Sequence, residues 1–171
     1  MNQDGFFDLI VGAPGDDNNG SASGSARVYS LVPQGVFHVG TGTPGCAGPQ
    51  LLGTNGDPFV GNAAFEIVGN HAPSSSLGLL LAADALNPVG WDPFGLGATF
   101  YIDFFSMSFL YGWDYPSDAH GSSALVVPIP NDANIVGLAV VFQSLSVWST
   151  PCGLGPFGIS TSMAAVAFLQ P

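Results

Sequence analysis

The chain has 171 residues and a formal net charge of −11, because it contains eleven Asp, one Glu, one Arg and no Lys. Nucleic acids and anionic membrane surfaces are both bound through Lys and Arg, so this composition excludes both partners. Only 8% of the residues are charged while 47% are hydrophobic, which predicts a folded chain with an uncharged polar surface. Such a surface suits contact with proteins or carbohydrates.

The sequence of residues 1–35 predicts a short β-hairpin. "DLIVGA" at 8–13 is an apolar run of strand length, "PGDDNNGSASG" at 14–24 is dense in turn formers, and "SARVYSL" at 25–31 alternates as a second strand. These strands make about half of a four-stranded blade, and such a hairpin is at best marginally stable alone in water. We therefore expect another β element, from this chain or from a second copy, to cover its edges.

Oxygen-bearing groups alternate just before the first strand. Asn2, Asp4, the backbone carbonyl of Phe6 and the carboxylate of Asp8, with Gly5 at the sharp turn, form the arrangement by which a short loop wraps calcium. The leading carboxylate of such a loop would fall before the first residue. The sequence therefore predicts an incomplete calcium loop, and calcium is the only cofactor it suggests.

The stretch "NQDGFFDLIVGAP" followed by "GSARVYSL" resembles an FG-GAP repeat, the blade unit of integrin α-chain propellers and of many secreted bacterial proteins. By position, Asn2 matches the third residue of the family's calcium loop, Asp4 the fifth, Gly5 the sixth and Asp8 the ninth. The resemblance implies an extracellular or cell-surface location. A single repeat cannot close a propeller, so we expect an isolated half-blade.

From Val36 on, the pattern is that of a β-sandwich, with seven or eight apolar or alternating segments separated by Gly, Pro, Asn and Ser. The clearest segments are "AAFEIVG", "SLGLLLAAD", "GATFYIDFF", "SFLYGW", "SSALVVPIP", "GLAVVFQSLSVW" and "SMAAVAFLQ". We expect an all-β protein, an antiparallel β-sandwich of Ig-like or jelly-roll-like kind over residues 36–171, with a two-stranded half-blade extension at residues 1–35.

Two local departures from this strand pattern are predicted. "PNDANIVG" at 130–137 favours one turn of helix, with Asp132 as its cap. The stretch from Val140 to Trp148 alternates around the polar Gln143, and its phase drifts near Ser144, which predicts a β-bulge there.

The order of "GTGTPGCAGP", "APSSSLGLLL", "DPFGLG", "DYPSDAHGSSA" and "PIPNDANIVGLAVVFQ" is similar to a C-terminal domain found repeatedly in large secreted proteins of planctomycete type. That resemblance implies an extracellular β-sandwich with no established activity, and it brings no catalytic residues.

The first ten residues lack a secretory signal, so we expect any signal to lie upstream. The longest apolar run, residues 77–86, is too short to span a bilayer, and no membrane insertion is expected.

Aromatic residues concentrate between residues 91 and 115. In "ATFYIDFF" they occupy both faces of the predicted strand, so this strand is either covered on both faces or exposes one as an interaction surface. Trp91, Tyr111, Trp113 and Tyr115 are the candidate binding platform for a carbohydrate or a protein.

Cys46 and Cys152 lie in Gly/Pro-rich turns, and neither context supplies the neighbours of a metal site or a catalytic thiol. A disulfide between them is predicted, and two free buried thiols are the alternative. Asn19, in "NGS", is a candidate glycosylation site. The histidines, His38, His71 and His120, are too widely spaced in sequence to predict a zinc site.

No pattern of residues predicts an enzyme. "GTGTPG" at 40–45 matches a dinucleotide-binding pattern, but Pro44 and further turns stand where a helix is required. Asp118, His120 and Ser122 lie on one turn without a nucleophile-elbow sequence.

We therefore expect a non-catalytic, extracellular structural or adhesive protein. In this reading it is a self-assembling fibre or surface-layer subunit that pairs β-strands with a second copy or a neighbouring β domain. The alternative is a carbohydrate- or calcium-dependent binding module of a larger secreted protein.

Overall fold

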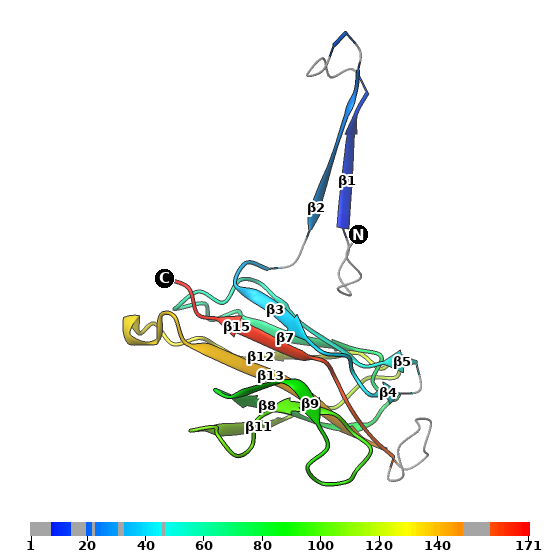
Figure 1. Cartoon of the computed structure of the whole chain (residues 1–171), viewed down its shortest axis with the longest axis vertical. Helices are drawn as coiled ribbons and strands as arrows, with labels where there is room; N and C mark the ends of the chain where they lie inside the picture. The colour runs from blue at the N-terminus through cyan, green and yellow to red at the C-terminus, as the bar shows by residue number, and fades with distance from the viewer. Residues whose placement is uncertain (1–7, 15–19, 22, 31–32, 46, 149–157) are drawn as a thin grey trace. The chain divides into compact units, whose positions relative to one another are not determined.

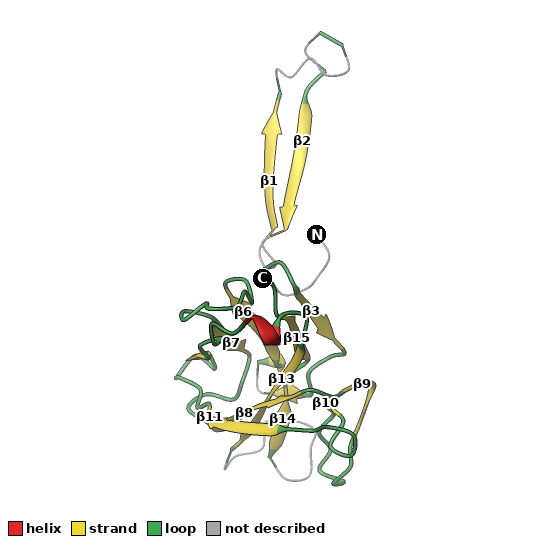
Figure 2. Cartoon of the chain, turned by 90° about the vertical axis from the view of Figure 1, so that its left-hand side faces the viewer, coloured by secondary structure: helices red, strands yellow, loops and turns green. Residues whose placement is uncertain are grey.

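The computed structural model describes residues 8–14, 20–21, 23–30, 33–45, 47–148 and 158–171. It confirms an all-β protein built on antiparallel sheets, and Figure 2 shows a single short helical turn among the described residues. The chain forms two compact units, Met1–Val32 and Pro33–Pro171. That residues 1–35 and 36–171 are separate folding domains stays a prediction. Within the described residues, no helix is long and apolar enough to cross a membrane.

The first unit is an antiparallel hairpin of the two predicted strands. β1 (Asp8–Ala13) and β2 (Ser25–Ser30) pair in continuous register, from Asp8 opposite Ser30 to Ala13 opposite Ser25. Successive side chains of a strand point to opposite faces. Ile10 and Val11 are therefore on different faces of this hairpin, and both are exposed.

The second unit is built on a six-stranded sheet whose neighbouring strands are all antiparallel (Figure 1). Its strands, from one edge to the other, are β11 (Leu110–Asp114), β8 (Leu77–Ala83), β13 (Ala139–Val147), β15 (Ala164–Phe168) and β3 (Val36–Val39), with β14 (Ile159–Thr161) also paired to β13. Two of its inner strands, β8 (LGLLLAA) and β15 (AAVAF), contain no polar side chain, which suits the inside of a sheet.

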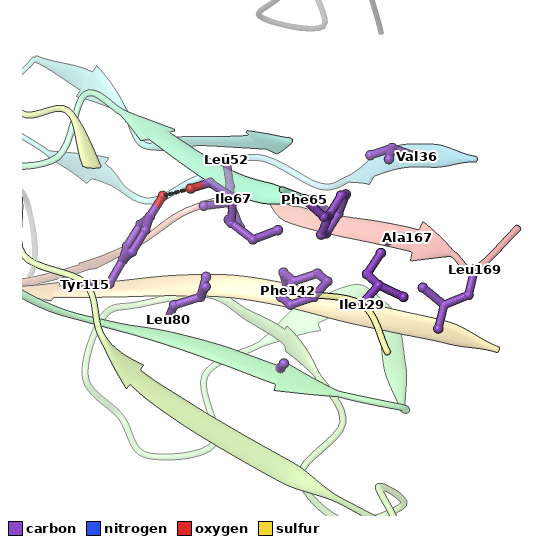
Figure 3. Close-up of a cluster of buried hydrophobic side chains, with 12 residues drawn as sticks. Val36, Leu52, Phe65, Ile67, Leu80, Tyr115, Ile129, Phe142, Ala167 and Leu169 are labelled. Carbon is purple, nitrogen blue, oxygen red and sulfur yellow. Dashed lines mark hydrogen bonds between the residues drawn. The ribbon is translucent and has the colours of Figure 1, made fainter. Parts of the chain in front are cut away.

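A three-stranded sheet covers the inner face of the larger one and completes the sandwich. Its strands, in spatial order, are β12 (Ser123–Val126), β7 (Glu66–Asn70) and β6 (Leu51–Asn55). Figure 3 shows the core between the two sheets, to which Leu52 and Ile67 contribute from the smaller sheet and Leu80 and Phe142 from the larger. Phe65, predicted to lie in phase with Ile67, is buried in the same core.

A hairpin of β9 (Leu86–Trp91) and β10 (Phe100–Ile102) packs against the opposite, outer face of the six-stranded sheet. Tyr101 and Ile102 join a second core with Ala83, Val141 and Val166 of the sheet. All of β10 is buried. β10 is therefore covered on both faces, the first of the two predicted alternatives, whereas Phe105 beyond its end is 82% exposed.

The remaining elements are short. β4 (Pro44–Gly45) and β5 (Gly48–Pro49) form a small hairpin, and η1 (Ala133–Ile135) is the predicted turn of helix. The predicted cap is confirmed, because the Asp132 carboxylate accepts a hydrogen bond from the backbone N–H of Asn134 at 2.9 Å. The structure corrects the predicted bulge: a register shift lies opposite Gln143 and Ser144, but the extra residue is on the partner side, at 162–164 between β14 and β15, and β13 keeps continuous register with β8.

Candidate binding surface

The two sheets of the sandwich differ in width, and this leaves the edge strand β11 partly open on its inner face. Three strands cannot cover six, and Tyr111 on β11 is 62% exposed. Trp113, two residues on and therefore on the same face, is half-buried against the core. The ring of Phe109 lies 5.6 Å from that of Tyr111, which lies 6.2 Å from that of Trp113. These three residues form a continuous surface, called the aromatic stripe below.

An apolar groove of about 150 Å³ runs beside the aromatic stripe. Residues 127–130, which follow β12, also line the groove. Phe65 and Phe142 of the core line it as well. Among the described residues, no charged side chain lines the groove, so its chemistry suits apolar groups or the flat faces of sugar rings.

The structure separates the four residues of the predicted platform. Tyr111 and Trp113 lie together, but Trp91 lies in the β9–β10 hairpin on the outer face of the sheet. The indole of Trp91 donates a hydrogen bond to the carbonyl of Ile102 at 3.2 Å, and its ring contacts Phe105 edge-on. Trp91 therefore belongs to that hairpin and is not part of the platform.

Tyr115 is also wrongly placed in the predicted platform. It is 4% exposed, and its hydroxyl donates to the carbonyls of Ile67 and Ser123 at 3.1 and 3.2 Å. Burial, and secondarily the charge of Glu66, raises the pKa of Tyr115, so the phenol stays neutral and holds the two sheets together. Phe109 takes its place on the surface; the alternation of Phe109, Tyr111 and Trp113 in "SFLYGW" is the signal that would have identified it.

Hydrogen bonds within the turn that carries Asp118, His120 and Ser122 stabilise its backbone. The Asp118 carboxylate accepts hydrogen bonds from the backbone N–H groups of His120 and Ser122, at 2.8 and 2.9 Å. These bonds, that of Ser122 first, lower the pKa of the Asp118 carboxyl. Among the residues that the structure describes, no group of three or more His, Cys, Asp or Glu side chains is arranged to hold a metal ion.

We expect the charge of Asp118 to stabilise the fold in a pH-dependent way. Because its pKa is lowered on folding, the carboxylate stabilises the folded chain above the ordinary aspartate pKa of about 3.9, and this contribution disappears as the pH falls through the folded-state value. Asp118→Asn keeps the acceptor oxygen and removes the charge. The urea midpoint of this variant should lie below that of the wild type at neutral pH and approach it in acid; a gap independent of pH would contradict this account.

Several predicted sites lie outside the described residues. They are the calcium ligands Asn2, Asp4 and Phe6, the cysteines Cys46 and Cys152, and the glycosylation site Asn19. Asp8 is described only as the first residue of β1. The calcium loop, the disulfide and the glycan therefore stay predictions.

Comparison with known proteins supports the resemblance of the N-terminal segment. Residues 1–29 match the FG-GAP repeat family. FG-GAP repeats are non-enzymatic structural or adhesive elements that occur in extracellular, adhesion-type proteins. No curated protein and no solved structure matches the chain. The resemblance of the sandwich to planctomycete-type secreted proteins stays a prediction.

Proposed function

We propose that this chain is a non-catalytic extracellular structural or adhesive protein, whose N-terminal hairpin pairs with a β element of a neighbour. The observation that carries the proposal is the unpaired edge of β1. Among the described residues it has β2 on one side and no strand on the other. An open strand edge presents unpaired N–H and C=O groups that another strand can bind.

The exposure of this hairpin supports the same conclusion. Ile10 is 55% and Val11 47% exposed, and they lie on opposite faces of β1. A two-stranded hairpin with both faces open gains little from burial and is marginal in water. A neighbouring β element, from a second copy or from another β domain, would supply the missing ladder and cover one of these side chains. Repeated pairing of this kind builds fibres or surface layers.

Substitution of Ile10 tests this proposal. We expect the full-length chain to self-associate in sedimentation velocity experiments, and Ile10→Lys to weaken the association, because lysine on an edge strand opposes pairing. Val89→Lys is the matched control, since Val89 is 87% exposed and belongs to β9 of the second unit. A wild-type chain that stays monomeric over a wide concentration range would sink the self-association part of the proposal.

The proposal also includes the predicted calcium ion and disulfide, both of which would stabilise the folded chain outside the cell. Calcium held by Asn2, Asp4, the Phe6 carbonyl and Asp8 would add metal-ligand bonds to the start of the first unit. A Cys46–Cys152 disulfide would link segments distant in sequence within the second unit.

The aromatic stripe favours a second candidate function, a carbohydrate-binding module of a larger secreted protein. The only Lys or Arg of the chain is Arg27, in the first unit, so the second unit has no permanent cation to pair with acidic sugars. A neutral glycan stacked on Tyr111 is the ligand that fits. On a glycan array, binding should be lost in Tyr111→Ala and kept in Val89→Ala, and absence of binding by the wild type would remove this candidate.

A further inference from the structure

On the edge strand β11, alternate residues direct their backbone N–H and C=O groups to the side that is not paired with β8. The backbone N–H of Tyr115, just past the strand, donates to the carbonyl of Gly78 at 2.8 Å, which fixes the phase of the ladder with β8. In an antiparallel ladder each residue directs its N–H and C=O to the same side, and successive residues alternate. The backbone groups of Leu110, Gly112 and Asp114 therefore point away from β8, toward the open edge.

This edge has few of the features that keep edge strands apart. Leu110–Asp114 contains no Lys, Arg or Pro, its pairing with β8 shows no bulge, and Asp114 is its single charge. The other edge of the same sheet differs. In β3, the backbone N–H of Val36 donates to the carbonyl of Pro33, and the ring of Phe37 stacks on Phe168 at 5.4 Å. Of the two edges of this sheet, β11 is therefore the one better suited to pair with an added strand.

The residues of β11 are self-complementary about Gly112. If two copies of the strand run antiparallel with Gly112 opposite the partner's Gly112, the two glycines exchange both backbone hydrogen bonds. Tyr111 then lies opposite the partner's Trp113, and Trp113 opposite the partner's Tyr111. Aromatic pairs directly across a ladder stabilise it, and here they would join the two aromatic stripes into one apolar surface.

The charge of the strand does not oppose this register. The two Asp114 carboxylates would lie at opposite ends of the pairing, about 14 Å apart along the strands at about 3.4 Å per residue. That separation exceeds the Debye length of about 8 Å at physiological ionic strength, so their repulsion is screened. The charge of −11 on each chain adds a long-range repulsion, and salt should therefore strengthen the association.

We propose that β11 pairs with β11 of a second copy, antiparallel about a twofold axis through Gly112, so that two six-stranded sheets become one continuous sheet. This inference does not depend on pairing by β1, because it uses a different edge in the other unit. The occupant is a second copy, since the register of this strand is complementary to itself.

A site-specific crosslink tests the register. Across the proposed pair, only position 112 faces its own copy, so Gly112→Cys should give a covalent dimer under mild oxidation. A side chain fits at this position, where an added Cβ would lie 3.7 Å from the nearest atom, in Leu81. Leu110→Cys is the matched control on the same face, with its two copies about 14 Å apart. Equal crosslinking of Gly112→Cys, Leu110→Cys and the wild type, or none in any of them, would overturn the proposal.

Sedimentation equilibrium of Gly112→Pro separates this interface from that of β1. Proline removes an N–H that points outward and leaves the ladder with β8 intact. Loss of the two central hydrogen bonds should raise the dimer dissociation constant about tenfold. An unchanged constant, with association abolished by Ile10→Lys, would overturn the β11 dimer and uphold pairing by β1. A monomeric wild type that binds neutral glycans through Tyr111 would assign the aromatic stripe to sugar and overturn the second copy as occupant.

Discussion

Replacement of Gln143 by leucine is expected to lower the free energy of unfolding by about 3 kcal/mol. Gln143 lies in the middle of β13 and is 1% exposed. Its side-chain oxygen accepts a hydrogen bond from the backbone N–H of Tyr101, and its amide nitrogen donates to the carbonyls of Thr99 and Ser162, each at 2.9 Å. Leucine fills a similar volume but leaves the N–H of Tyr101 and the carbonyl of Ser162 without a partner, and such groups cost about 1–3 kcal/mol each when they stay buried.

The effect should be large because the amide joins separate parts of the fold. Thr99 and Tyr101 belong to the segment of β10, and Ser162 lies between β14 and β15. A second contact reinforces the first, since the hydroxyl of Thr161 donates to the same Thr99 carbonyl at 2.7 Å. Loss of Gln143 therefore weakens the attachment of the β9–β10 hairpin to the outer face of the sheet.

Urea unfolding followed by tryptophan fluorescence measures the change. The matched control is Gln34→Leu, because Gln34 is exposed and contributes its backbone N–H, not its side chain, to the bond with Asp57. The control should stay within about 0.5 kcal/mol of the wild type. A Gln143→Leu variant as stable as this control would show that water or local movement replaces the lost partners.

The sequence predicted most strands of the sandwich because burial there follows simple alternation. "SLGLLLAAD" and "SMAAVAFLQ" became β8 and β15, while β3, β6 and β14 were not among the predicted segments. β9 was missed, since it runs through Asn87 and Pro88, residues that ordinarily mark turns. It forms because its partner β10 is held by the buried side chain of Gln143, a contact distant in sequence.

The candidate site was only half predictable for a related reason. The alternation places Tyr111, Trp113 and Tyr115 on one face of the sheet, but whether that face is open depends on how far the smaller sheet extends over it. Tyr115 lies under the smaller sheet, where it bonds to Ile67, and Tyr111 lies beyond it. No local pattern distinguishes the two positions. Trp91 was grouped with them by proximity in sequence, and the β9–β10 hairpin carries it to the outer face.

Two separate edges on one chain give the proposed assembly a definite geometry. A twofold contact at β11 closes on itself and produces only a dimer. A further contact made by β1 of each copy would link such dimers into an open chain. If both contacts are twofold, the proposed fibre or surface layer requires both edges; pairing by β1 alone extends only where β1 joins a different edge of the next copy.

Gly78→Ala is expected to lower the free energy of unfolding by about 3 kcal/mol and to displace β11. A Cβ atom at Gly78 would lie 2.1 Å from the backbone oxygen of Tyr115, much closer than any non-bonded contact allows. The backbone of Tyr115 has little freedom to move, because its N–H bonds to the Gly78 carbonyl at 2.8 Å and its ring is fixed in the core. The added methyl group therefore forces β8 and the end of β11 apart.

Gly112→Ala, on the strand paired with β8, provides the matched control. There the nearest atoms to an added Cβ lie at 3.7 and 4.0 Å, ordinary contact distances. Its stability should stay within about 0.5 kcal/mol of the wild type, with a small gain because alanine loses less backbone entropy on folding than glycine. Urea unfolding measures both variants, and near-ultraviolet circular dichroism reports the packing of Trp113 beside Tyr111. If Gly78→Ala matched Gly112→Ala in both measurements, β11 would be free to move relative to β8. The fold would then not hold the aromatic stripe in a fixed position for binding a glycan or a second copy.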